Sequence, residues 1–374
     1  MKVLIDLTYI SSQSTAGVVL YAFRLLKGMY SLKNVDVSLL VTEDNQERIK
    51  SECPFFEQIL FHEHCRSLTK YFFYLRRYVN GGKINSLITE NNADIFFSPY
   101  LYAGALTTSH VPQIGVLHDT QTYILKSRQL VKGWIHRIFM NRILKHMTAI
   151  VTISNYAKDS IYKTIVSLRT PVHVIYNSIA VLPYSDKEPK TRNYPYILNV
   201  NSLEPYKNLM TLVKALNELK DTIPHKLLIK ARKLPYWDDV VMPFITEHDL
   251  QDRIVLIEEK YDEQQMKMLY RDAALFVSPS LMEGFGYTPV EAAMYGIPVI
   301  CSKETALYET TKGLLFYYEP ATDHKRLSDR IVEVLNHKPD NLQGIAETFA
   351  ACYSPESQAT QLAEIFEKTL RSRG

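Results

Sequence analysis

Short apolar runs alternate with helical patterns along the chain. In the first half, six runs predict strands, and several are rich in Val and Ile without alternating polar residues, as expected for strands buried on both faces of a parallel sheet. These runs are residues 3–6, 37–41, 94–97, 114–117, 149–153 and 172–176. Apolar residues at helical spacing lie between them, for example over 18–30 and 156–165. This order predicts an open α/β sheet.

Residues 180–195 interrupt that order. They contain three prolines, five charged residues and little apolar content, which is typical of a linker. A second series of strands is predicted at 196–200, 226–229, 254–257, 275–278 and 299–301, and residues 355–373 carry apolar side chains at helical spacing. We therefore predict an α/β protein of two doubly wound, Rossmann-like domains facing across a cleft, over residues 1–182 and 192–354.

The composition is that of an ordinary folded protein. Among 374 residues, 46% are hydrophobic and 22% are charged, a balance that excludes a mainly disordered chain. The four cysteines form no C-x-x-C pair, so neither a zinc ribbon nor a dithiol redox motif is expected. The N-terminal apolar run is interrupted by Asp6, and no stretch has the length of a membrane-spanning helix. These features predict a cytoplasmic protein.

Charge is divided unevenly between the two halves. Residues 1–182 carry 20 Lys and Arg against 12 Asp and Glu, whereas the remainder carries 23 against 28. Two stretches, 64–83 and 126–147, contain basic residues and no acidic ones. They are compatible with peripheral binding to the anionic inner face of the cytoplasmic membrane, and equally with helices that pack their apolar faces into the domain. Nucleic acid is not an expected partner, because no recognised binding module accompanies the charge.

Ligand chemistry is expected outside the carboxyl ends of the strands, where open α/β sheets bind ligands. Residues 275–291 read LFVSPSLMEGFGYTPVE, a predicted strand followed by a Gly-containing loop. Thr288 and the proline after it have the composition of a helix start. Gly284 and Gly286 allow backbone N–H groups to face an anion beside that helix N-terminus. The segment therefore predicts an anion site.

Two carboxylates, Glu283 and Glu291, flank this anion site. Taken alone, Glu291 fits a capping box with Thr288, and Glu283 fits a solvated loop acid. The whole string E-G-F-G-x-x-P-x-E resembles the E-x7-E motif of the retaining glycosyltransferases of family 4, which have the GT-B fold of two Rossmann-like domains. The resemblance extends over residues 268–309 and 196–212, and in the first half over 117–119, 151–155 and 174–177.

The resemblance implies catalytic roles for three residues. Lys207, after a strand and just before a helix, is expected to contact the donor diphosphate, on which charge builds as the glycosidic bond breaks. Glu283 is expected to position the donor sugar and stabilise charge, without covalent catalysis. His118 is expected where the first domain meets the donor sugar; without the family match, a structural histidine beside Asp119 is the simpler interpretation.

The resemblance also implies a set of donor-binding residues. Glu291 is expected to accept hydrogen bonds from the ribose hydroxyls, because a carboxylate has lone pairs for a vicinal diol. Phe285 and Gly286 are expected to offer backbone N–H groups to sugar or phosphate oxygens, next to Gly284 in the same loop. Gly17, before the first helix, is expected to allow close approach of that helix to donor or acceptor.

Two departures from the family pattern concern the phosphates. Family members commonly have an Arg one or a few positions before the Lys, where this chain has Ser202 and Tyr206. We expect Arg232, after the predicted strand 226–229, to supply the second cation, although Lys230 stands where the family commonly has Gly. No D-x-D triplet is present to hold a metal ion, so we predict no metal and no cofactor.

The leading hypothesis is a metal-independent, retaining transferase that moves a sugar from a UDP- or GDP-linked donor to a glycan or lipid-linked glycan, in surface polysaccharide assembly. By resemblance, residues 1–182 with a returning C-terminal helix, 355–374, form the acceptor domain, and 192–354 bind the nucleotide sugar. A dinucleotide-dependent oxidoreductase would need G-x-G-x-x-G after the first strand, which is absent. A non-catalytic protein that binds nucleotide sugars or glycans on the same fold stays open.

Overall fold

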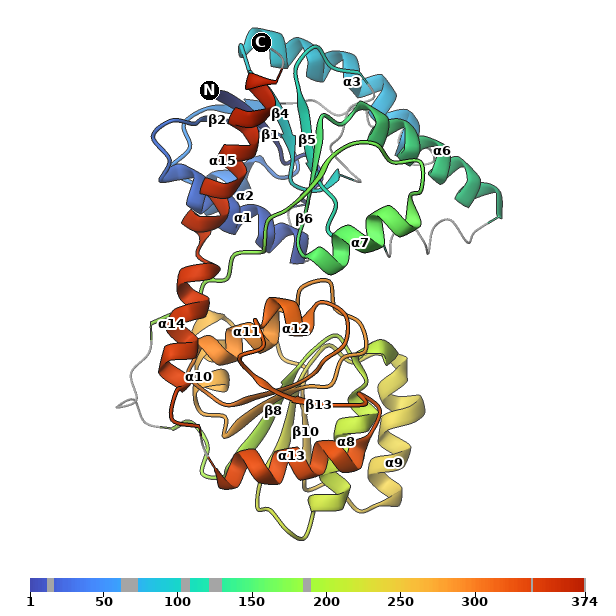
Figure 1. Cartoon of the computed structure of the whole chain (residues 1–374), viewed down its shortest axis with the longest axis vertical. Coiled ribbons are helices and arrows are strands. Elements are labelled where there is room, and N and C mark those ends of the chain that lie inside the picture. The colour runs from blue at the N-terminus through green and yellow to red at the C-terminus, as the bar shows by residue number, and fades with distance from the viewer. Residues whose placement is uncertain are drawn as a thin grey trace. The chain divides into compact units, whose positions relative to one another are not determined.

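The structure of the protein is a computed structural model. It describes residues 1–11, 17–61, 73–101, 108–120, 130–183, 190–337 and 339–372, without the side chains of 61, 73–80, 130–136 and 139. The chain forms two compact units (Figure 1). The first contains Met1–Ser178 and Tyr353–Gly374, and the second contains Ile179–Cys352.

Within the described part of the chain, the first unit has a sheet of seven parallel strands in the order β3-β2-β1-β4-β5-β6-β7. The strands are β1 (Lys2–Asp6), β2 (Asp36–Val41), β3 (Ile59–Phe61), β4 (Ile95–Ser98), β5 (Gln113–Val116), β6 (Ala149–Thr152) and β7 (Val172–Val174). The helices are α1 (Gly17–Tyr30), α2 (Gln46–Glu52), α3 (Phe73–Glu90), α6 (Leu130–His146), α7 (Asn155–Thr164) and α15 (Pro355–Arg371). The apolar runs predict all of these strands except β3, an edge strand too short to show a pattern.

Over the residues described, the second unit has six parallel strands in the order β10-β9-β8-β11-β12-β13. The strands are β8 (Tyr196–Val200), β9 (Lys226–Lys230), β10 (Ile254–Ile257), β11 (Leu275–Ser278), β12 (Val299–Ser302) and β13 (Phe316–Tyr318). The helices are α8 (Leu209–Leu219), α9 (Met242–Glu247), α10 (Glu263–Arg271), α11 (Tyr287–Met294), α12 (Leu307–Thr310), α13 (His324–Asn336) and α14 (Leu342–Cys352). Again the sequence misses only the short edge strand, β13.

The central strands are buried along their whole length. Every residue of β4, β5, β6, β11 and β12 is buried, and helices cover both sides of each sheet (Figure 1). This environment explains why these strands are continuous apolar runs without alternation. The predicted pair of doubly wound Rossmann-like sheets is confirmed.

The C-terminal helix belongs to the first unit, as predicted. α15 lies along α1, and Gly28 of α1 permits the contact, because a Cβ atom there would be 2.0 Å from Pro355 O. Leu362 and Phe366 of α15 are buried in the same apolar cluster as Val3 and Ile5 of β1. The end of the chain therefore completes the core of the unit that the beginning of the chain starts.

In both sheets the strand order reverses beside the first strand of the unit. β1 lies between β2 and β4, and β8 lies between β9 and β11. Loops that leave the carboxyl ends at such a switch point diverge and open a crevice for ligands. In the second sheet these loops carry Lys207, after β8, and Glu283, after β11.

The two basic stretches fall partly outside the described residues, which omit 64–72 and 126–129. Over the described end of α6, Met140, Ile143 and Leu144 are buried, whereas Arg137 and Arg142 are exposed. That part of the helix packs its apolar face into the first unit and leaves its charges in water. Among the described residues, no helix has both the length and the apolar character needed to cross a bilayer.

Candidate active site at the carboxyl edge of the second sheet

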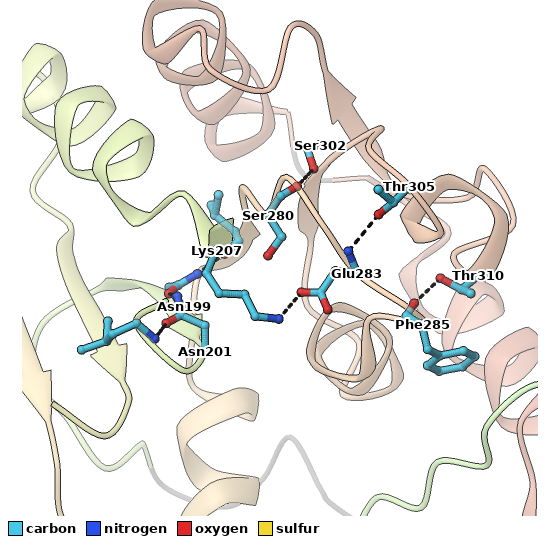
Figure 2. Close-up of polar contacts among 11 residues, drawn as sticks. Asn199, Asn201, Lys207, Ser280, Glu283, Phe285, Ser302, Thr305 and Thr310 are labelled. Carbon is cyan, nitrogen blue, oxygen red and sulfur yellow. Dashed lines mark hydrogen bonds and ion pairs between the residues drawn. The ribbon is translucent and has the colours of Figure 1, made fainter. Parts of the chain in front are cut away.

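The loop after β8 is shaped by a chain of asparagine contacts. Asn199, buried at the end of β8, donates from Nδ2 to Val277 O on the neighbouring β11 (2.8 Å), and its Oδ1 accepts from Asn201 Nδ2. Asn201 Oδ1 in turn accepts from the Leu203 N–H at 2.7 Å. The backbone then forms a 3₁₀ turn over Pro205–Lys207 before α8 begins. These contacts bring Lys207 to the edge of the sheet (Figure 2).

The loop after β11 is fixed by hydroxyl groups of its neighbours. The Ser302 hydroxyl, at the end of β12, donates to Ser280 O at 2.5 Å, and the Glu283 N–H donates to Thr305 Oγ1 at 2.8 Å. The Leu281 N–H donates to Tyr206 O at 2.8 Å, which joins this loop directly to the turn that carries Lys207. Glu283 is thereby held by the loops that follow both β8 and β12.

Lys207 and Glu283 meet at this edge (Figure 2). The Lys207 Nζ lies 2.7 Å from Glu283 Oε1, although 76 residues separate them in the sequence. Their side chains are 16% and 14% exposed, so both charges are largely withdrawn from water. Removing the two charges from water costs free energy, which their mutual attraction offsets. Replacing either residue would leave the other charge buried without its partner. Two of the three residues predicted as catalytic, Lys207 and Glu283, are therefore neighbours.

This pair has a defined chemical capacity. A fixed ammonium group at a switch point attracts an anion such as a diphosphate. A carboxylate beside it accepts hydrogen bonds from hydroxyl groups. The pKa of the Cys301 thiol is raised well above its usual range, mainly by burial and in addition by the negative charge of Glu283. Among the described residues, no group of three or more His, Cys, Asp and Glu side chains is arranged to hold a metal ion.

The start of α11 corrects one local prediction. The helix begins at Tyr287 with Gly286 at the N-cap position, so Thr288 lies inside the helix and does not cap it. Gly286 has a φ of 86°, and a Cβ atom there would also lie 2.6 Å from Leu307 Cδ2. The backbone conformation and the lack of space both require glycine at this position. The prediction that Thr288 caps the helix does not consider either constraint.

Glu291 does not form the predicted capping box with Thr288. Its Oε2 accepts a hydrogen bond from the Tyr270 hydroxyl at 3.1 Å. Tyr270 is buried and stacks on Tyr295, with ring centroids 5.5 Å apart and an interplanar angle of 15°. Glu291 is thus oriented by a side chain of α10, which leaves its predicted role at the ribose untested.

The remaining loop residues have mixed positions. Phe285 buries its ring, and its carbonyl oxygen accepts from the Thr310 hydroxyl at 2.5 Å. Gly284 is partly exposed between Glu283 and Phe285. Arg232 is exposed after β9. Lys230 donates to Glu259 O at 2.7 Å, and burial lowers the pKa of its ammonium group.

His118 and Gly17 lie in the first unit. The His118 Nε2–H donates to Pro99 O at 3.0 Å, and its ring meets Tyr21 edge-on with centroids 4.6 Å apart. Burial lowers the pKa of His118 to about 4. The imidazole is therefore neutral near pH 7, with Nδ1 as its hydrogen-bond acceptor. Gly17 is exposed, and a Cβ atom there would have no neighbour within 4 Å, so this unit's own packing does not require glycine.

No motif in the sequence predicts roles for Asn208, Thr305 or Tyr270. Asn208 follows Lys207 with a φ of 56°, in the left-handed region that asparagine tolerates better than most residues. An asparagine between a strand loop and a helical pattern is a usable signal for such a position. Thr305 and Tyr270 act on Glu283 and Glu291 from other elements, and no local pattern marks them.

Two family models match adjoining parts of the chain. The model described as Glycosyltransferase Family 4 matches residues 15–181, and the model described as Glycosyl transferases group 1 matches residues 183–348. The chain belongs to the GT-B glycosyltransferases. The second match contains both Lys207 and Glu283, and the first contains His118.

Relatives of this GT-B glycosyltransferase include the O-antigen chain mannosyltransferase RfbU of Salmonella typhimurium, 26% identical over 60% of this chain and 61% of that protein. The matched region thus spans about three fifths of that relative. The sucrose-phosphate synthase of Thermosynechococcus elongatus has a TM-score of 0.76 at 15% identity over 100% of both chains. Anabaena HepE in complex with UDP and glucose has a TM-score of 0.69 at 16% identity, over 98% of this chain and 100% of that one. These structures share its fold.

Proposed function

We propose that this chain is a retaining glycosyltransferase of family 4 that moves a hexose from a nucleotide-diphosphate sugar to a glycan or lipid-linked glycan. The observation that carries the proposal is the Lys207–Glu283 ion pair at the switch point of the second sheet. A cation and a carboxylate in contact at a ligand-binding edge suit a substrate that joins a diphosphate to a sugar.

Lys207 would act on the leaving group. As the bond between sugar and diphosphate breaks, negative charge grows on the phosphate oxygens. An ammonium group fixed at this point stabilises the transition state more than the ground state, which raises the rate of the chemical step. Because the loops already hold Lys207, little reorganisation accompanies the reaction. The same cation takes the place that a divalent metal fills in other transferases, so the proposed reaction needs none.

The two carboxylates would bind different parts of the donor. Glu283, beside Lys207, would bind hydroxyl groups of the donor sugar and stabilise positive charge on its ring. Glu291, held by the Tyr270 hydroxyl, would accept hydrogen bonds from the ribose. The backbone N–H groups of the Gly284–Phe285–Gly286 segment would bind sugar or phosphate oxygens, with Arg232 as the second phosphate cation.

His118 would serve as a hydrogen-bond acceptor and not as an acid. Its Nε2–H is engaged by Pro99 O, so Nδ1 is the atom that receives a sugar hydroxyl. We infer that the acceptor attacks from the face that the leaving diphosphate vacates, with a phosphate oxygen taking the acceptor proton. That route retains the anomeric configuration without a protein nucleophile.

The printed names of two relatives support a proposal on the class of substrate. RfbU is named as an O-antigen chain mannosyltransferase, and the HepE structure holds UDP and glucose. We propose a hexose carried by GDP or UDP as the donor and a growing surface polysaccharide as the acceptor.

A thermal-shift panel of nucleoside diphosphates and nucleotide sugars identifies the donor, because a ligand that binds only the folded state raises its stability with concentration. The chosen donor is then incubated with glycan acceptors, with and without EDTA, and the product's anomeric configuration is determined by NMR. Transfer with retention and without metal is expected. Binding without any turnover would support the non-catalytic alternative, and an inverted product would overturn the proposed mechanism.

A further inference from the structure

Lys207 and Glu283 belong to different loops, so their separation depends on whatever joins those loops. The residue after Lys207 is Asn208, which has φ 56° and ψ 35° and is 8% exposed. It is the last residue before α8, and its N–H donates to Pro205 O at 3.0 Å, which closes the turn. Any change at Asn208 acts directly on the backbone that carries the Lys207 side chain.

The Asn208 side chain connects three loops at this edge. Its Nδ2 donates to Pro279 O at 3.0 Å, in the loop that leads from β11 to Glu283. It also donates to Ala321 O at 2.8 Å, after β13, and its Oδ1 accepts from the Thr211 hydroxyl at 2.8 Å. Both protons of the amide and its oxygen are therefore in use.

Asparagine suits this position for two independent reasons. A positive φ is readily adopted by Gly, Asn and Asp, and most other side chains strain it. Of these three, asparagine alone brings N–H donors to two buried carbonyl oxygens. Ala321 O also accepts from the Tyr318 hydroxyl at 2.9 Å. Loss of the amide therefore leaves the β13 loop attached and mainly removes the side-chain tie that holds the turn carrying Lys207 against Pro279 of the β11 loop.

We propose that Asn208 is a positioning residue for the transfer reaction, which sets the placement of Lys207 relative to Glu283 by tying the β8 loop to the β11 loop. This inference rests on the proposed function of Lys207 and Glu283. Asn208 acts through Lys207 and touches no reacting atom. A displacement of about 1 Å at such a site costs up to roughly 100-fold in rate.

The test compares Asn208→Gly with Asn92→Gly. Asn92 has a φ of 50° and lies two residues after α3 in the first unit, so both substitutions exchange a left-handed asparagine for glycine. Thermal unfolding and kcat are measured for both with the donor found above. Asn208→Gly is expected to lower kcat roughly 10- to 100-fold, whereas Asn92→Gly keeps wild-type kcat. Equal kcat in the two variants would overturn the proposal.

A double substitution separates positioning from general loss of structure. In the Lys207→Ala background, Asn208→Gly is expected to cause little further loss of kcat, because its target is already gone. A full additional loss would show that Asn208 does not act through Lys207. If Asn208→Gly does not fold, Asn208→Asp keeps the side-chain volume and the acceptor for Thr211, removes both donors, and is held to the same outcomes. Wild-type activity of Lys207→Ala itself would overturn the proposed function instead.

Discussion

The two sheets share one topology but carry different chemistry at their carboxyl edges. In the second unit the edge is charged: Lys207 and Glu283 are 2.7 Å apart and the surrounding loops are bound to each other by asparagine and hydroxyl side chains. In the first unit the described edge is mainly aromatic, with the buried carboxyl group of Asp6 at the end of β1. His118 meets Tyr21 edge-on, and Tyr9 and Tyr100 have ring centroids 5.4 Å apart.

Burial keeps His118 and Tyr9 of the first edge uncharged near pH 7. It lowers the pKa of His118 to about 4, and burial together with the Asp6 carboxylate raises the pKa of Tyr9 well above its usual value. Near pH 7 His118 and Tyr9 offer neutral donors, acceptors and ring faces, whereas the second edge offers the cation of Lys207 and the anion of Glu283. The same fold thus provides one edge suited to a phosphorylated donor and one suited to hydroxyl-rich, uncharged groups, a difference that supports the proposed division of labour.

The largest expected effect concerns the charged edge. Lys207→Ala and Glu283→Gln are each expected to lower kcat/KM for transfer by about 10²- to 10³-fold, because each removes a charged contact made to the transition state. Both residues lie in loops, so the far-ultraviolet circular dichroism should be unchanged. Lys303→Ala is the matched control, since Lys303 pairs with Glu319 at 2.6 Å but in an exposed position. Comparable losses in the control would remove the distinction between the two pairs.

A second, opposite effect is expected on binding of the product nucleotide. In the free protein the Lys207 ammonium group is bound to the Glu283 carboxylate, so a diphosphate must compete with Glu283 for Lys207. Glu283→Gln is therefore expected to tighten binding of the nucleoside diphosphate about 3- to 10-fold while transfer is lost, corresponding to roughly 1 kcal/mol. Isothermal titration calorimetry measures this.

The gain should depend on Lys207. In the Lys207→Ala background, Glu283→Gln is expected to give no tightening, and Glu319→Gln, which releases Lys303 in the same unit, should give none in either background. A gain that persists without Lys207 would mean that Glu283 repels the diphosphate in general and does not hold this cation.

The neutral state of His118 is tested by the pH dependence of stability. Burial lowers the pKa of His118 from 6.5 to about 4 in the folded protein. Between pH 6.5 and pH 4 the unfolded chain therefore binds a proton at this residue that the folded protein does not bind. The free energy of unfolding should therefore fall as the pH drops from 7 to 5, by an amount on the order of 1 to 2 kcal/mol. Urea unfolding of His118→Gln should show a smaller fall than the wild type. Identical pH dependence would contradict a buried, neutral His118.

A salt-dependent effect is expected at the exposed basic face of α6. Replacing Arg137, Arg142 and Lys145 with Gln should weaken sedimentation with anionic vesicles at low salt, at about 1 kcal/mol per charge, and the difference should vanish at high salt. The control for net charge is a second triple variant, in which the exposed residues Lys27, Lys163 and Arg169 of the same unit are replaced with Gln. If both triple variants bind vesicles as the wild type does, this face is an ordinary solvated surface and the predicted membrane contact is wrong.

Much of the fold follows from local pattern. Continuous apolar runs predict the central strands because both faces of each sheet are covered, and such strands have one requirement along their length. The edge strands β3 and β13 escape prediction, because an edge position does not demand an unbroken apolar run. The edge strand β7 has the same length and is predicted from the longer run 172–176. The cap of α11 is predicted two residues late, at Thr288 instead of Gly286, because contact with Leu307 and the positive φ of Gly286 decide the position.

For the site, the sequence by itself determined which residues carry charge at the strand ends: Lys207 after β8, and Glu283 and Glu291 around the glycine loop. Only the tertiary structure decided how they are used. Lys207 meets Glu283, Glu291 binds Tyr270, and Asn208 ties one loop to two others. A residue's position next to a strand is set by a few neighbours in the chain, whereas these contacts join segments that become neighbours only when the parallel strands align their carboxyl ends.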